Sequence, residues 1–178
     1  MKTVTIRAFA ERKYAKVPIN RIRVLNSRKR SQVHFQQNVR SIEQVGLRKP
    51  VVVNERHFAE TGRYDLVCGE GRYLAYKALG HEEIPAEVVN CTDSEALLYS
   101  LVENIARVPP GTMWFAWEVK RMHDAGLSLA EISRITGKSE AYVGDFVNLV
   151  EQGEERLIKG VEDGVFPMAF ATRVARSD

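Results

Sequence analysis

The Pro109-Pro110-Gly111 segment constrains the fold of this chain more than any other feature. Proline has no backbone N–H to donate and restricts the residue before it, so a helix that reaches two consecutive prolines has to end. Short β-branched runs alternate with helical patterns before this segment, and only helical patterns follow it. We therefore predict an α+β domain with a small mixed sheet at residues 17–108 and an all-α domain at residues 112–178.

The first domain is predicted to alternate strands with helices. Runs rich in β-branched residues and bounded by turns predict strands, and apolar residues that recur every three to four positions predict helices. The expected strands are residues 50–53, 64–68 and 84–89, with a short extended stretch at 22–24, and the expected helices are residues 31–45, 73–79 and 93 to near 107.

Positive charge is concentrated at the N-terminal end of the chain. Residues 1–49 hold 13 of the 26 Lys and Arg residues but only two of the 23 acidic residues, a net charge of +11, so the remainder carries −8. Residues 1–16 also lack apolar periodicity, and we expect them to form a basic, flexible arm. Such an arm fits an anionic ligand or an acidic protein surface, although a solvated tail without a partner produces the same pattern.

Membrane-spanning and secreted proteins have sequence features that this chain lacks. No apolar run approaches the roughly 20 residues of a membrane span, and the first ten residues have no apolar signal-peptide core. Cys68 and Cys91 are too far apart for a CxxC metal or redox motif. We therefore expect two buried thiols, a cytoplasmic protein and no membrane partner.

Gly69-Glu70-Gly71-Arg72 lies between a predicted strand and a predicted helix. Glycine lets the backbone approach a ligand closely, and a helix N-terminus favours a phosphate through its N–H groups and its dipole. The planar guanidinium of Arg72 suits phosphate oxygens. The motif predicts a phosphate site, although a Gly-x-Gly sequence is also common as an ordinary turn between a strand and a helix.

Glu103-Asn104-Ile105-Ala106-Arg107 closes the last helix of the first domain. With Ile105 in the core, Glu103, Asn104 and Arg107 lie on the adjoining face. The oxygen atoms of Glu103 and Asn104 suit a Mg²⁺ ion that bridges phosphates, and Glu103 is also a candidate catalytic base. A surface pair between Glu103 and Arg107, four residues apart on a helix, is the alternative.

Residues 128–150 match a helix-turn-helix, in which the second helix enters the major groove of double-stranded DNA. Ser128 and Ser139 are predicted to cap the two helices, with a turn at residues 136–138. The segment carries a net charge of −1, which is unfavourable for binding phosphates, so a plain helical hairpin is the alternative. The residues expected near DNA are Lys138, Ser139, Glu140, Ala141, Tyr142, Asp145 and Asn148.

These motifs, in this order, resemble the ParB/RepB partition family over residues 17–174. The part from Glu151 onward is most similar to the RepB-type plasmid branch. The individual resemblances are residues 42–53 to the family's helix–Gly–Pro–strand segment, Cys68–Arg72 to its GERR phosphate motif with Gly71 in place of the first arginine, Glu103–Arg107 to its ENxxR motif, and residues 137–143 to the start of its recognition helix.

The resemblance implies a CTP-dependent DNA clamp, or centromere-binding factor, for plasmid or chromosome segregation. Members of the family bind CTP with Mg²⁺, form homodimers and act with a ParA-type Walker ATPase, which a basic N-terminal peptide stimulates. By resemblance, Glu103 and Asn104 are metal ligands, and weak CTP hydrolysis acts as a switch. The implied nucleotide-binding residues are Arg30, Gly46, Pro50, Gly69, Glu70, Gly71, Arg72, Asn104 and Arg107.

Two other functions fit the same patterns. One is an enzyme of this fold, a nuclease or a small-molecule phosphotransferase, with Glu70 or Glu103 as the base. The other is a helix-turn-helix transcriptional regulator that uses no nucleotide. Binding of CTP favours the clamp, binding of ATP or ADP favours the enzyme, and binding of neither favours the regulator. The last predicted helix follows Pro167 and has no stop signal, so we also expect a further C-terminal domain.

Overall fold

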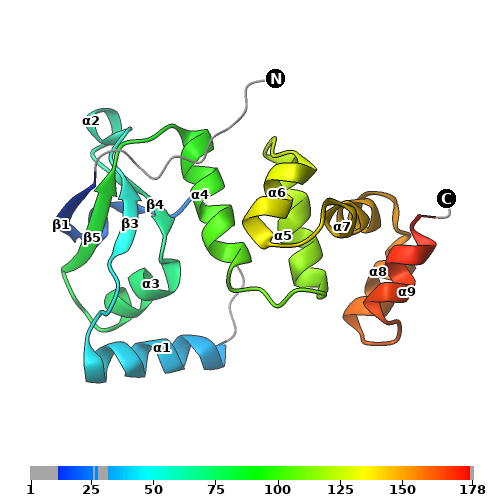
Figure 1. Cartoon of the computed structure of the whole chain (residues 1–178). Helices are drawn as coiled ribbons and strands as arrows, with labels where there is room; N and C mark the ends of the chain where they lie inside the picture. The colour runs from blue at the N-terminus through cyan, green and yellow to red at the C-terminus, as the bar shows by residue number, and fades with distance from the viewer. Residues whose placement is uncertain (1–11, 26, 28–31, 177–178) are drawn as a thin grey trace. The chain divides into compact units, whose positions relative to one another are not determined.

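The computed structural model describes residues 12–25, 27 and 32–176 (Figure 1). Among these residues the chain divides into two compact units, one up to Ala96 and one from Leu97 onward. The division falls within helix α4 (Asp93–Ile105), before the Pro-Pro-Gly segment that was predicted as the boundary. The reason is packing, because Leu98, Leu101 and Ile105 are buried in the core of the second unit.

The first unit is built on a five-stranded mixed sheet with the strand order β1-β5-β3-β4-β2. β1 pairs with β5 and β3 pairs with β4 in antiparallel fashion, whereas the β5–β3 and β4–β2 pairs are parallel. The central β3 is buried throughout, as expected for a continuous valine run between two neighbours. The strands are β1 (Lys13–Pro18), β2 (Ile22–Arg23), β3 (Val51–Asn54), β4 (Tyr64–Cys68) and β5 (Glu83–Val89).

Helices and a short 3₁₀ turn accompany this sheet. A 3₁₀ turn at Ile19–Arg21 joins β1 to β2, and α2 (Phe58–Thr61) lies between β3 and β4. Helix α1 (Gln32–Val45) contacts α3 (Glu70–Ala78), as Figure 1 shows. The buried apolar core of the unit consists of Val17, Ile19, Ile22, Val51, Val53, Tyr73, Ile84, Ala86 and Val88.

The second unit contains only helices among its described residues. A single apolar core runs through it and includes Phe115, Met122 and Leu149. Three of its helices have a side-chain N-cap. The hydroxyls of Thr112, Ser128 and Ser139 accept hydrogen bonds from backbone N–H groups in the first turns of these helices. The helices after α4 are α5 (Met113–Asp124), α6 (Leu129–Thr136), α7 (Glu140–Gln152), α8 (Glu155–Glu162) and α9 (Met168–Val174).

The structure corrects the prediction of a flexible N-terminal arm. Lys13–Lys16 belong to β1, which pairs with β5 at one edge of the sheet, so the arm expected at residues 1–16 overlaps a strand. The sequence did not predict this strand because its composition is polar. An edge strand exposes most of its side chains and tolerates lysine. Arg12 and Lys13 also form ion pairs with Glu87 and Glu55, which attaches the start of the strand to its surroundings.

A buried side chain fixes the connection between β5 and α4. Asn54 is 2% exposed, and its Nδ2 donates to the carbonyl oxygen of Cys91 at 2.9 Å while its Oδ1 accepts from the N–H of Cys91 at 3.1 Å. Both cysteines are buried free thiols, as predicted, and burial raises the pKa of Cys91 to about 11. Such a thiol stays protonated at neutral pH, which argues against a reactive cysteine.

Candidate functional site

The glycine-containing motif opens helix α3. Gly69 is the N-cap residue directly after β4, and α3 begins at Glu70, three residues earlier than the sequence predicts. The N–H of Tyr73 makes the first helical hydrogen bond, to the carbonyl oxygen of Gly69 at 2.9 Å. The first turn of α3 therefore presents N–H groups without acceptors inside the helix, together with the positive end of the helix dipole. This arrangement suits a phosphate.

Gly69 occupies a position that no other residue fits without strain. Its φ of +99° lies in the left-handed region. A Cβ atom at this position lies 2.9 Å from Cγ1 of Val51 and 3.0 Å from Nη2 of Arg72, distances shorter than normal carbon contacts. Val51 is completely buried. The backbone at Gly69 thus comes close to β3 where the motif predicts a phosphate site.

Arg72 holds the start of α3 against the loop before β3. Its Nη1 donates to the carbonyl oxygen of Lys49 at 2.7 Å and to that of Pro50 at 2.5 Å. The structure therefore brings Pro50 and Arg72 together, two residues that the resemblance assigns to one site. Gly46 ends α1 with a φ of +79° and begins the loop that leads to Pro50. Arg72 has a positioning role in this loop, which the sequence did not reveal.

Glu70 lies in the first turn of α3, where a negative charge is favourable for the helix dipole. Its Oε1 accepts a hydrogen bond from Oγ of Ser27 at 2.7 Å, which ties the segment before α1 to the motif. Gly71 is half-buried in the same turn. Arg30, a predicted phosphate contact, lies outside the described residues.

The second predicted cluster belongs to the other unit. Glu103 of α4 forms an ion pair with Arg107, the arrangement that the sequence offered as the structural alternative. Nδ2 of Asn104 donates to Oγ of Ser100 at 3.5 Å. Glu103, Asn104 and Arg107 lie along the end of α4, and the described residues hold no group of three or more His, Cys, Asp or Glu side chains that fits a metal ion.

Helices α6 and α7 are joined by a tight turn at Gly137, whose φ is +68°. Ser128 forms the predicted capping box with Glu131, whose Oε2 accepts hydrogen bonds from the N–H and Oγ of Ser128. Ser139 caps α7 by accepting from the N–H of Tyr142 at 3.2 Å. The residues predicted near DNA that are exposed are Ser139, Glu140, Ala141 and Asn148.

The other three predicted DNA contacts are half-buried. The ring of Tyr142 packs against Phe146 with a centroid distance of 4.6 Å and meets Phe115 edge-on, and this burial raises its pKa. Lys138 is half-buried, and its carbonyl oxygen accepts from Oγ of Ser133 at 2.5 Å. Asp145 is ion-paired with Arg176, a residue that the sequence did not point to because 31 positions separate the two.

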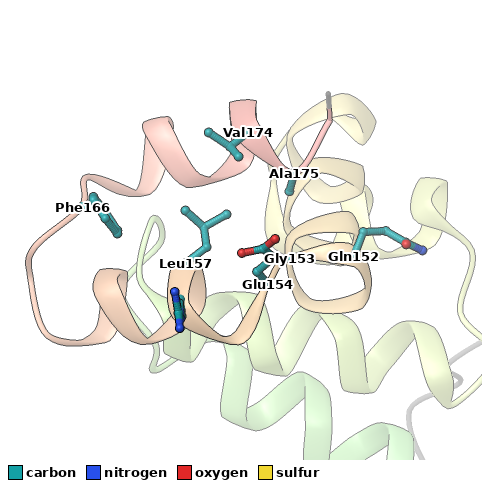
Figure 2. A pocket seen from close by; sticks show the side chains of 8 residues that line it. Gln152, Gly153, Glu154, Leu157, Phe166, Val174 and Ala175 are labelled. Atoms are coloured by element: carbon teal, nitrogen blue, oxygen red, sulfur yellow. The ribbon is translucent and has the colours of Figure 1, made fainter. Parts of the chain in front are cut away.

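A pocket of about 290 Å³ lies where α7, α8 and α9 meet (Figure 2). Leu157, Phe166 and Val174 supply its apolar lining, and Gln152 and Glu154 its polar edge. None of the predicted nucleotide-binding or DNA-binding residues lines it. Across the described part of the chain, no helix is long and apolar enough to cross a membrane.

Comparison with known proteins matches residues 5–105 to the ParB N-terminal domain. The chain is 34% identical over 117 residues to the chromosome-partitioning protein Spo0J of Thermus thermophilus, which covers 66% of this chain and 42% of that protein. It is 30% identical over 135 residues to the nucleoid occlusion protein of Bacillus pumilus, covering 74% of this chain and 43% of the relative. The chain thus spans less than half the length of these curated relatives.

Among solved structures, the chain is similar to the C-terminally truncated ParB from Caulobacter crescentus complexed to the centromeric parS site. The TM-score is 0.71 at 20% identity, and the match covers 90% of this chain and 84% of that one. The Pnob8-like ParB-N domain matches with a TM-score of 0.59 at 16% identity, over 93% and 80% of the two chains. These likenesses confirm the mixed α+β fold, and the RepB-type branch stays a prediction. Because the family match covers more than half of the residues of this chain, the chain belongs to the ParB N-terminal domain family.

Proposed function

We propose that this protein is a CTP-dependent clamp on DNA that acts in partition. The observation that carries the proposal is the start of α3, where Gly69 brings the backbone against β3 in a conformation that excludes a side chain. The first-turn N–H groups of α3, within a ParB N-terminal domain, are suited to bind the phosphates of a nucleotide.

The nucleotide is expected to be held by groups from two loops of the first unit. The first-turn N–H groups of α3 approach the phosphates, and Arg72 keeps the loop from Gly46 to Pro50 in place through its two backbone contacts. Gly71 stands where the family motif has an arginine, so this chain has one guanidinium fewer at the phosphates. We therefore expect weaker CTP binding than a site with both arginines provides.

Glu103 and Asn104 are proposed to hold Mg²⁺. Carboxylate and amide oxygens are ligands that this ion prefers, and the ion neutralises phosphate charge. In the structure Arg107 forms an ion pair with the carboxylate of Glu103. The ion pair engages one oxygen of the carboxylate, Oε1, and we expect Mg²⁺ to compete with Arg107 for this group. The same carboxylate is the candidate base for any slow hydrolysis of CTP.

DNA binding is assigned to the α6–turn–α7 segment, used as a helix-turn-helix. Ser139, Glu140 and Ala141 are exposed at the start of α7, which supports the use of this turn against DNA. The Caulobacter crescentus protein of similar fold was solved on its parS site. Because the α6–α7 segment has a net charge of −1, we expect weak and strongly salt-dependent binding by this chain alone, and tighter binding by a homodimer that engages two half-sites.

The N-terminal residues are proposed to contact a ParA-type ATPase. Lys13 and Lys16 are part of β1, so the partner-binding segment is restricted to the residues that precede the strand. The proposal predicts that this segment is dispensable for nucleotide binding.

The clamp is tested with a parS-containing duplex whose two ends are blocked by bound protein. With CTP and Mg²⁺, the chain should remain on this closed DNA through a high-salt wash and should leave a duplex with one open end. Gly69→Ala should abolish retention, and Gly62→Ala, at an isolated turn glycine, should not. Equal loss from closed and open DNA would contradict the clamp. Retention with ATP in place of CTP would favour the enzyme, and retention without any nucleotide would favour the regulator.

A further inference from the structure

An ion pair links the predicted recognition helix α7 to the last helix. Nε of Arg176 donates to Oδ1 of Asp145 at 2.6 Å, and its Nη2 contacts Oδ2 of the same carboxylate. Both oxygens of Asp145 are therefore engaged by one guanidinium in the fork-to-fork geometry that gives strong, directional pairs. The side chain of Asp145 is 19% exposed and that of Arg176 is 56% exposed, so the cation forms the outer surface of the pair.

Asp145 lies on the face of α7 that would meet DNA. Residues 141, 145 and 148 are four and three positions apart, so they share one side of the helix. Ala141 and Asn148 on this side are exposed, whereas Val143, Phe146 and Val147 on the other side are buried. A carboxylate in the middle of the exposed face would repel the DNA backbone unless another charge compensates it.

Arg176 is held in position by the packing of α9. Ala171 and Ala175, on the last turns before Arg176, are buried in the same core as Phe146 and Leu149 of α7. The backbone next to Arg176 is thus packed against α7, which keeps the guanidinium within reach of Asp145. The hydrogen bond to Asp145 also raises the pKa of Arg176 above its ordinary value.

We infer that Arg176 neutralises Asp145 at the DNA interface, and that Asp145 supports α7 rather than reading a base. The inference rests on the proposed use of α6 and α7 to bind DNA. It weakens the electrostatic objection to that use, because adding Arg176 raises the local net charge from −1 to 0. Glu131 is bound in the capping box of α6, and Glu140 lies in the first turn of α7.

The test measures the charge that the interface presents. Fluorescence anisotropy with a labelled parS duplex and with a labelled duplex of unrelated sequence is recorded over a range of salt concentrations, for the full chain without nucleotide. The variants are Arg176→Gln, Asp145→Asn and the double variant Asp145→Asn/Arg176→Gln. Lys159→Gln, which removes an exposed cation from α8, is the control for charge loss elsewhere in the unit. Circular dichroism checks that each variant is folded.

The expected order of affinity follows the local charge. At about 0.1 M salt, Arg176→Gln should bind both duplexes about eightfold more weakly, and the slope of log affinity against log salt concentration should be smaller by about 1. Asp145→Asn should bind both duplexes more tightly by a similar factor. The double variant should return to within about twofold of the unaltered chain, and Lys159→Gln should change the slope less than Arg176→Gln.

Three outcomes would overturn the inference. Weaker binding by Asp145→Asn would make Asp145 a direct base contact. A double variant as weak as Arg176→Gln would make Arg176 a direct DNA contact. Unchanged binding by Arg176→Gln would place the pair outside the interface. If the unaltered chain binds neither duplex, the proposed DNA function fails, and the inference that rests on it fails with it.

Discussion

Replacement of Gly69 by alanine tests whether the close approach of α3 to β3 is required. The φ of +99° costs an alanine about 1–2 kcal/mol relative to glycine. The new methyl group would also lie 2.9 Å from Cγ1 of Val51, a side chain with no exposed surface. Forcing a methyl group into a packed site costs about 1–3 kcal/mol more. We therefore expect Gly69→Ala to lower the free energy of unfolding by about 2–5 kcal/mol.

Gly62→Ala separates these two contributions. Gly62 has a φ of +66°, and a Cβ atom there has no neighbour within 4 Å, so the control has the backbone strain without the collision. We expect it to lose only about 1–2 kcal/mol. Urea unfolding followed by circular dichroism measures both values under one set of conditions.

The reasoning fails if Gly69→Ala is no less stable than Gly62→Ala. That result would show that Val51 and Arg72 adjust to a side chain at little cost, and that the start of α3 is not held against β3. Titration of the folded fraction of Gly69→Ala with CTP adds a second check. Ordinary CTP affinity in this variant would show that the nucleotide does not need the close approach.

Four further predictions concern other parts of the chain. Arg72→Ala should lower the free energy of unfolding by about 1–3 kcal/mol through the loss of its two backbone hydrogen bonds, and should weaken CTP binding ten- to a hundredfold or thereabouts, measured by urea unfolding and calorimetry. Tyr142→Phe should keep DNA affinity within about twofold in anisotropy, because its ring serves the core rather than a base; a loss near tenfold would mean that the hydroxyl contacts DNA. Glu131→Gln should flatten the loss of thermal stability in acid. Hydrogen bonds from the N-cap serine lower the pKa of Glu131, so its contribution is complete above the ordinary value of 4.5 and is lost as pH falls through the lower folded-state pKa; identical pH profiles would contradict this. Deletion of residues 1–11 should abolish stimulation of the ATPase and spare CTP binding, whereas a deletion that extends into β1 should also lower stability.

The elements that bury continuous apolar runs were predictable from the sequence. β3 occurs where its run of three valines predicts it, because a strand between two neighbours is buried on both faces. β1 was missed because an edge strand exposes most of its side chains, and lysines there resemble a solvated arm. The unit boundary was misplaced because the prolines end the chain's helical run locally, whereas the division follows the packing of Leu98 and Leu101.

The sequence predicted which residues form the candidate site but not what they contact. Local patterns identified Gly69 and the caps at Ser128 and Ser139, since each of these roles depends on neighbours within a few positions. The contact of Arg72 with the carbonyl of Pro50 and the pairing of Asp145 with Arg176 join residues far apart in the chain. No local spacing encodes such contacts, and they appear only once the units are folded.

The nucleotide specificity of the unaltered chain is measured by isothermal titration with CTP and Mg²⁺, beside ATP and GTP under the same conditions. We expect saturable binding of CTP alone. Gly69→Ala should lose this binding, and Gly62→Ala should retain it. Absence of CTP binding to the folded chain, or equal binding of ATP, would contradict the claim that the start of α3 is the phosphate site of a CTP-dependent DNA clamp.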